Sequence, residues 1–143
     1  METVELHLTN NLAELDRLNA LVAGFGERVN FTATEEYSIY LIIEEIFTNI
    51  VNHAWSDPGE HSIFFRLSAS KETAKMEFHD DGQPFDPTEA DTPDIHASVE
   101  DRPIGGLGLH LVREAASEMF YQRLEEQNQL IVIMNRGQQE LKS

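Results

Sequence analysis

The stretch Glu45-Ile-Phe-Thr-Asn49-Ile-Val-Asn52-His53 lies inside a segment whose apolar residues recur every three or four positions. Such spacing predicts an amphipathic helix with one buried face. The buried stripe consists of isoleucines, namely Ile39, Ile42, Ile43, Ile46 and Ile50. Glu45, Asn49 and His53 follow one another at intervals of four, so they share a second, polar face of this helix, with Asn52 beside them.

This polar face offers ligands for a hard metal ion. Magnesium prefers oxygen donors, takes few protein ligands and keeps several waters. Asn49 is the candidate ligand, and Glu45, one turn earlier, can then act as a base towards a hydroxyl group. Glu44 is a competing candidate for the base, although it points about a quarter-turn away from Asn49. Taken alone, the spacing also fits a solvated helix face, and His53 fits a helix-end histidine held by a backbone carbonyl or the helix dipole.

A second segment, Asp80-Asp-Gly-Gln-Pro-Phe-Asp-Pro87, follows an alternating stretch that is typical of a strand. A carboxylate at position 80 can accept a hydrogen bond from the exocyclic amine of adenine. Gly82 lets the backbone approach a flat base closely, and Phe85 can form a wall of the same pocket. An Asp-Gly turn beside a buried phenylalanine is the plainer interpretation of this segment alone.

A third segment, Gly105-Gly106-Leu107-Gly108-Leu109-His-Leu111, precedes a run with helical spacing. Glycines before a helix expose backbone N–H groups that can bind phosphates, and the helix dipole favours the anion. Arg102 and Arg113 flank the segment and can contact phosphate oxygens, and a surface charge is the alternative for each. A flexible hinge into the helix is the alternative for this segment alone.

The remaining sequence predicts one α+β domain spanning residues 1–143. Alternation predicts strands at about 4–9, 61–70, 74–79, 119–126 and 129–135. Helices are expected from Asn10 or Asn11 to about Arg28, from Thr32 or Thr34 to about Trp55, and from about Gly106 to Ser117. These elements predict a two-layer sandwich, in which a mixed, mostly antiparallel sheet carries its helices on one face. The stretch from Gly82 to about Ile104 is long for a connection, which is typical of functional loops.

Composition restricts the partners. The chain has 143 residues, a formal net charge of −16 and no cysteine. The charge disfavours nucleic acid and anionic membranes and leaves a basic protein surface as a plausible partner, while bound ATP remains compatible because helix ends and metal ions act locally. The lack of cysteine excludes disulfides and thiolate zinc sites. No apolar run approaches the roughly 18 residues of a membrane span, and the N-terminus lacks signal-peptide features, so we expect a cytoplasmic protein.

In this order and spacing, the three segments resemble the nucleotide site of GHKL-type (Bergerat-fold) ATP-binding domains, the histidine kinase-like ATPases. Over almost its whole length, the chain looks most like the anti-sigma-factor serine-protein kinases of that superfamily. Glu45, Asn49 and His53 match the family's N box, and residues 80–87 and 105–111 match its two glycine boxes. The Pro-Phe-Asp-Pro ending at 84–87 is the most specific part of the match.

The resemblance implies ATP and Mg²⁺ as cofactors and assigns roles to individual residues. Glu45 is implied as the catalytic base, Asn49 as the magnesium ligand and Asp80 as the residue that reads adenine. Further nucleotide contacts are implied for Asn52, His53, Gly82, Phe85, Arg102, Gly105, Gly106, Leu107, Gly108 and Leu109. The loop at about 88–104 is implied as the ATP lid, and Arg17 matches an arginine of the first helix that contacts partner proteins.

The resemblance also implies a function. A kinase of this family phosphorylates a serine on an anti-anti-sigma protein and sequesters a sigma factor, usually as a homodimer. A non-catalytic, nucleotide-binding module that holds a sigma factor or another regulator is the alternative. The presence of Glu45 favours the kinase, because binding alone needs no base. A role in another two-component or phosphatase-linked pathway is a third hypothesis, and autophosphorylation on histidine is disfavoured because no phosphoacceptor helix pair is present.

Overall fold

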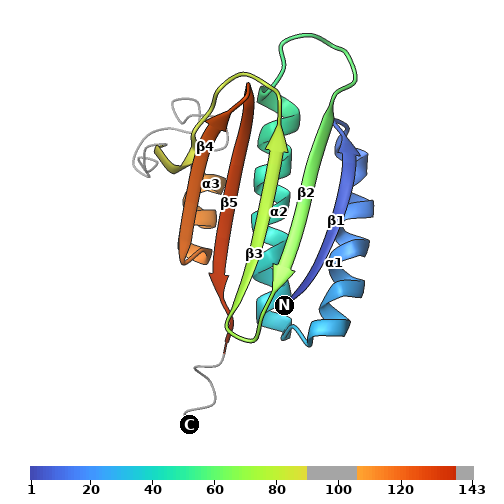
Figure 1. The fold of residues 1–143 in the computed structure, drawn as a ribbon, viewed down its shortest axis with the longest axis vertical. Coiled ribbons are helices and arrows are strands. Elements are labelled where there is room, and N and C mark those ends of the chain that lie inside the picture. The colour runs from blue at the N-terminus through green and yellow to red at the C-terminus, as the bar shows by residue number, and fades with distance from the viewer. Residues whose placement is uncertain (90–105, 138–143) are drawn as a thin grey trace.

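The described part of the chain forms a five-stranded sheet backed by three α-helices (Figure 1). The computed structural model describes residues 1–89 and 106–137. The strand order in space is β1 (Glu2–Thr9), β2 (Ser62–Ala69), β3 (Thr73–Asp80), β5 (Gln127–Asn135) and β4 (Glu118–Leu124). All neighbouring pairs of described strands are antiparallel, whereas the sequence predicted a mixed, mostly antiparallel sheet. The predicted fold class, an α+β sandwich with its helices on one face, is confirmed.

The helices cover one face of this sheet, with α2 between α1 and α3 (Figure 1). Their bounds are Leu15–Val29 for α1, Ala33–His53 for α2 and Gly106–Ala115 for α3, and short 3₁₀ turns occur at η1 (Leu12–Glu14) and η2 (Pro87–Glu89). Of the two caps proposed for each start, Asn11 caps η1 and Thr32 caps α2. Thr32 forms a capping box with Glu35, in which each side chain accepts from the other residue's backbone N–H.

The core lies between the sheet and the three described helices, with α2 as the central helix. Ile39, Ile42 and Ile43 of α2 are fully buried, as the isoleucine stripe predicted. They pack with the inward-facing residues of β2 and β3, which alternate along each strand: Ile63, Phe65, Leu67, Ala74, Met76 and Phe78. This packing fixes the ends of β3 and α2, and both lead into the loops that carry the candidate site.

Arg136 ties the other end of the sheet to the turn between α1 and α2. Its guanidinium donates to the carbonyls of Val29 (2.9 Å), Asn30 (3.0 Å) and Ser70 (2.9 Å) and to the Glu35 carboxylate (3.3 Å). The side chains of Arg136 and Glu35 are only 10% and 8% exposed. Because β5 ends here, beside the start of β3, this buried ion pair stabilises the end of the sheet that lies opposite Asp80.

No helix within residues 1–89 and 106–137 is both long and apolar enough to span a bilayer.

Candidate functional site

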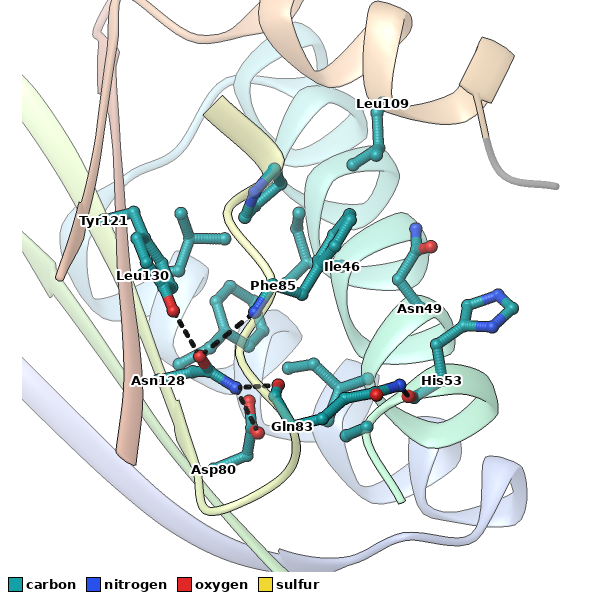
Figure 2. A pocket seen from close by; sticks show the side chains of 14 residues that line it. Ile46, Asn49, His53, Asp80, Gln83, Phe85, Leu109, Tyr121, Asn128 and Leu130 are labelled. Carbon is teal, nitrogen blue, oxygen red and sulfur yellow. Dashed lines mark hydrogen bonds between the residues drawn. The ribbon is translucent and has the colours of Figure 1, made fainter. Parts of the chain in front are cut away.

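A pocket lies where the end of α2, the end of β3, the start of β5 and the first turns of α3 meet (Figure 2). It is lined by Ile46, Asn49, Ile50, His53, Ala54, Phe78, Asp80, Gln83, Phe85, Pro87, Leu109, Tyr121, Asn128 and Leu130. Its volume is about 40 Å³, which is room for a few water molecules. The structure thus brings residues from all three sequence segments to one place.

Asp80 presents a buried carboxylate to this pocket. The residue is 5% exposed. Its Oδ1 accepts hydrogen bonds from the Gly82 N–H (2.9 Å) and from Asn128 Nδ2 (3.0 Å), whereas Oδ2 accepts none from any described residue. Burial raises the pKa of Asp80, and these two hydrogen bonds act in the opposite direction. Oδ2 is therefore an available acceptor for a ligand's N–H group.

Asn128 holds Asp80 in this position, and the sequence analysis did not identify it. Its amide Nδ2 donates to Asp80 and to the Gln83 carbonyl (2.9 Å), and its Oδ1 accepts from the Tyr121 hydroxyl and the Phe85 N–H (Figure 2). The residue is 6% exposed, so a full set of partners is needed at this depth. A polar residue in phase with the inward-facing apolar residues of β5 is the signal that could have revealed it.

Gly82 has a packing role at the rim of the pocket. A Cβ atom at this position would lie 2.5 Å from the Ala54 carbonyl oxygen, at the end of α2. The next residue, Gln83, donates its N–H to that same oxygen (2.7 Å) and its side chain to the His53 carbonyl (2.6 Å). Arg123 donates to the Gly82 carbonyl (2.6 Å) from β4. The loop after β3 is thus fastened to α2, and only glycine fits the point of closest approach.

Glu45 and Asn49 form a hydrogen-bonded pair on α2. Asn49 Nδ2 donates to the Glu45 carbonyl (2.9 Å) and to its carboxylate Oε2 (3.1 Å). That orientation leaves Asn49 Oδ1 with no donor among the described residues, so it can bind a cation. Burial raises the pKa of Glu45, the Asn49 hydrogen bond opposes that shift, and the charge of Glu44 adds to it. Glu44 itself is exposed.

The described residues contain no cluster of three or more His, Asp or Glu side chains that could hold a metal. Magnesium does not need such a cluster, because it keeps several waters and takes oxygens from a substrate's phosphates. The single available oxygen of Asn49 fits that mode of binding.

The third segment is only partly described. Arg102 and Gly105 lie outside the described residues, as does the predicted lid from residue 90 onwards. Gly106 and Leu107 form the start of α3. Leu109 is 4% exposed and lines the pocket, so it is a wall residue.

The remaining predicted residues lie at the edge of the pocket or away from it. His53 is exposed and lines the pocket, whereas Asn52, which is also exposed, is not part of the lining. Phe85 is 47% exposed and extends from the loop after β3 towards α2 (Figure 2). Arg17 lies on α1, where its side chain is 55% exposed and pairs with Glu14 (2.8 Å).

Residues 8–134 match the family model of the histidine kinase-like ATPase domain. The serine/threonine-protein kinase BtrW of Bordetella bronchiseptica is 30% identical over 103 residues, which cover 72% of each chain. The serine-protein kinase RsbW of Bacillus cereus is 29% identical over 116 residues, which cover 78% of this chain and 71% of RsbW. The solved histidine kinase domain of a blue-light activated kinase from Erythrobacter litoralis has the same fold, with a TM-score of 0.55 at 20% identity over 91% of this chain and 63% of that one.

This chain therefore belongs to the histidine kinase-like ATPase domain family, as the three sequence segments predicted. ATP binding is implied by that membership, and the named kinases among its relatives support a kinase role. The likeness to the solved histidine kinase domain supports the fold alone.

Proposed function

We propose that the domain is an ATP-dependent, magnesium-requiring protein-serine kinase of a partner-switching system. The observation that carries the proposal is the Glu45–Asn49 pair, which lies beside a pocket whose opposite wall holds Asp80. The proposed metal ligand and the proposed acceptor for adenine thus line one cavity, and the proposed base is hydrogen-bonded to the metal ligand. Serine as the acceptor residue is supported by the name of the RsbW relative.

The adenine end of the site is formed by Asp80. Its Oδ2 accepts the exocyclic amine, while Asn128 and the Gly82 N–H hold Oδ1 in place. The pocket has a volume of about 40 Å³, which is room for a few water molecules. Phe85 is the lining aromatic with 47% exposure, so we expect its ring to move outward and pack on the base.

The phosphate end of the site is formed by α2 and the start of α3. Asn49 Oδ1 holds the magnesium ion, which supplies positive charge to the phosphate oxygens when bound. Glu45 accepts the proton of the serine hydroxyl as that oxygen bonds to the γ-phosphorus and the bond to the bridging oxygen breaks, which releases ADP. Burial raises the pKa of Glu45, and a raised pKa makes a carboxylate a stronger base.

The proposed partners follow from the resemblance of the sequence. The serine acceptor lies on an anti-anti-sigma protein, and the domain, as a homodimer, also sequesters a sigma factor. Arg17 is an exposed cation on α1, outside the pocket lining, so a partner can contact it without blocking the nucleotide.

The test compares Glu45→Gln with Glu44→Gln, a matched change at the exposed neighbour. Transfer of labelled phosphate from ATP to candidate anti-anti-sigma proteins, and the thermal shift with Mg²⁺-ATP, are measured for both. Ligand at about a hundred times its dissociation constant adds roughly 2.7 kcal/mol, a rise of roughly 5–15 °C in the unfolding midpoint. Glu45→Gln should keep this shift and lose transfer, while Glu44→Gln should keep both.

Three results would count against the proposal. Unchanged transfer by Glu45→Gln together with loss in Glu44→Gln moves the base to Glu44. Nucleotide binding by the wild type without transfer to any candidate supports the non-catalytic module that holds a sigma factor or another regulator. No shift with any nucleotide removes the proposed site altogether.

A further inference from the structure

Gly108 is the third residue of α3, and its surroundings differ from those expected of a phosphate-binding glycine. The three atoms nearest to a Cβ built on Gly108 are Cδ, Oε1 and Oε2 of Glu45, and all three would overlap with it. The Glu45 carboxylate therefore occupies the space that any side chain at position 108 would need. This contact joins two segments that are more than sixty positions apart in the sequence.

Other described glycines have different neighbours, although a Cβ at Gly26 or Gly59 would also meet one carboxylate oxygen, of Glu36 or Asp57, at 2.8 Å. A Cβ at Gly24, on the exposed face of α1, would meet no atom within 4 Å. A Cβ at Gly82 would meet the backbone of Ala54. At Gly108 the obstacle is the functional group of the proposed base.

We propose that Gly108 is a positioning residue for Glu45, because its missing side chain gives the carboxylate a fixed place against α3. This inference rests on the proposed function, in which Glu45 is the base. The carboxylate accepts a hydrogen bond from Asn49 Nδ2, at 3.1 Å, and occupies the space that a side chain at Gly108 of α3 would fill. The proposed base therefore lies directly against the first turn of α3.

The helix cannot give way to a side chain at position 108. Leu109 and Val112 of α3 are 4% and 0% exposed, and both belong to the central core. Moving α3 outward would open a cavity beneath them, which is costly in a close-packed interior. The Glu45 side chain is only partly buried, so it is the group that moves, and Gly108→Ala displaces the base from Asn49.

The displacement predicts a particular kinetic defect. Asp80 and Asn49 keep their positions in Gly108→Ala, so the KM for ATP should change less than threefold while kcat falls at least tenfold. A glycine needed only for phosphate contact gives the opposite pattern, in which KM and the dissociation constant for ATP rise. The displacement should also lower the stability of Gly108→Ala. Glu45→Asp, whose side chain is shorter by one methylene, should restore part of that stability when it is combined with Gly108→Ala.

A double-mutant cycle on the whole chain tests the contact without relying on activity. Gly108→Ala is made in the wild type, in Glu45→Ala and in the isosteric Glu45→Gln, and Gly24→Ala serves as the control. Alanine is the better helix former, so Gly24→Ala should raise the midpoint of the ligand-free protein by about 1–5 °C. Gly108→Ala should give a similar rise in Glu45→Ala, but should lower the midpoint in the wild type and in Glu45→Gln.

Equal shifts from Gly108→Ala in all three backgrounds would overturn the inference, because Glu45 would then not be the obstacle. If Gly108→Ala also raises the ATP dissociation constant in the Glu45→Ala background, the inference fails as well. Gly108 would then act in phosphate binding. The midpoints are measured without nucleotide or substrate. If the cycle shows coupling but the wild type transfers no phosphate, the contact stands and the proposed function fails.

Discussion

Replacing Asp80 with asparagine should separate the stability of the ligand-free domain from its affinity for nucleotide. Asparagine has the shape of aspartate, and its Oδ1 can keep the hydrogen bonds from the Gly82 N–H and Asn128 Nδ2. Each of these bonds loses its charged acceptor, at a cost of about 1 kcal/mol. Burial nevertheless raises the pKa of Asp80 despite both bonds, so the fold disfavours the ionised form and gains when the charge is removed.

The sign of the pH dependence follows from this direction. A carboxyl group whose pKa is raised in the folded state binds its proton more tightly there than in the unfolded chain. Ionisation of Asp80 therefore lowers wild-type stability as pH rises from the ordinary carboxyl range to the raised pKa, and the loss persists above it. At neutral pH, we expect the free energy of unfolding of Asp80→Asn to equal that of the wild type or to exceed it by up to about 1 kcal/mol. This corresponds to a rise of up to about 5 °C in the unfolding midpoint. The difference should vanish on acidification.

The affinity for ATP should change in the opposite direction. Because Oδ1 is held by its two donors, the asparagine side chain points Nδ2 towards the pocket. Nδ2 and the exocyclic amine of adenine are both donors, so no hydrogen bond forms between them. Leaving that group unpaired costs about 1–3 kcal/mol, which corresponds to an affinity about five- to 150-fold weaker. Adenine nucleotides should lose this affinity whether or not magnesium is present.

Calorimetric titration with ATP and urea denaturation at several pH values measure the two effects. Asp81→Asn is the matched control, since it removes the same charge from the exposed neighbouring residue, which bonds to Trp55 instead. Its affinity for ATP should stay within about threefold of the wild type. A loss of more than about 1 kcal/mol in ligand-free Asp80→Asn at neutral pH would refute the argument from burial, and unchanged ATP affinity would refute the adenine contact.

Three further substitutions test other parts of the structure. Gly82→Ala should cost about 1–3 kcal/mol in urea denaturation, because its Cβ would overlap the Ala54 backbone; a neutral effect would mean that the loop can shift. Arg136→Met should cost about 3–5 kcal/mol by leaving Glu35 buried without its ion pair, yet leave the ATP dissociation constant of the folded protein unchanged. Asn49→Ala should abolish the magnesium dependence of ATP binding, measured by titration with and without Mg²⁺. If the variant keeps this dependence, Asn49 is not the metal ligand.

Much of the fold could be predicted because its signals are local. The isoleucine spacing predicted the buried face of α2. Thr32, one of the two caps expected for this helix, forms its capping box with Glu35, only three positions later. The predicted strands differ from the observed ones by a few residues at their ends. Strand pairing depends on contacts between distant residues, so the sequence could not establish that every described pair is antiparallel.

The candidate site divides in the same way. Asp80 and Asn49 could be identified because each stands in a short motif with its own spacing. Asn128 could not, because its role depends on pairing across the sheet, where it lies opposite Asp80. The packing roles of Gly82 and Gly108 were also out of reach, since each depends on how closely α2 approaches another segment in space.

Buried carboxylates are stabilised at one end of the domain and destabilised at the other. At one end, the Thr32 capping box and the buried Arg136–Glu35 pair satisfy their polar groups, and the pKa of Glu35 is lowered despite its burial, because backbone and Arg136 hydrogen bonds outweigh desolvation. At the other end, Asp80 and Glu45 are carboxylates whose pKa values burial raises. Natural proteins break local rules mainly where function requires it. Neutralising a carboxylate should therefore stabilise the ligand-free domain at the Asp80 end and destabilise it at the Glu35 end. At neutral pH, Asp80→Asn should raise the unfolding midpoint and Glu35→Gln should lower it.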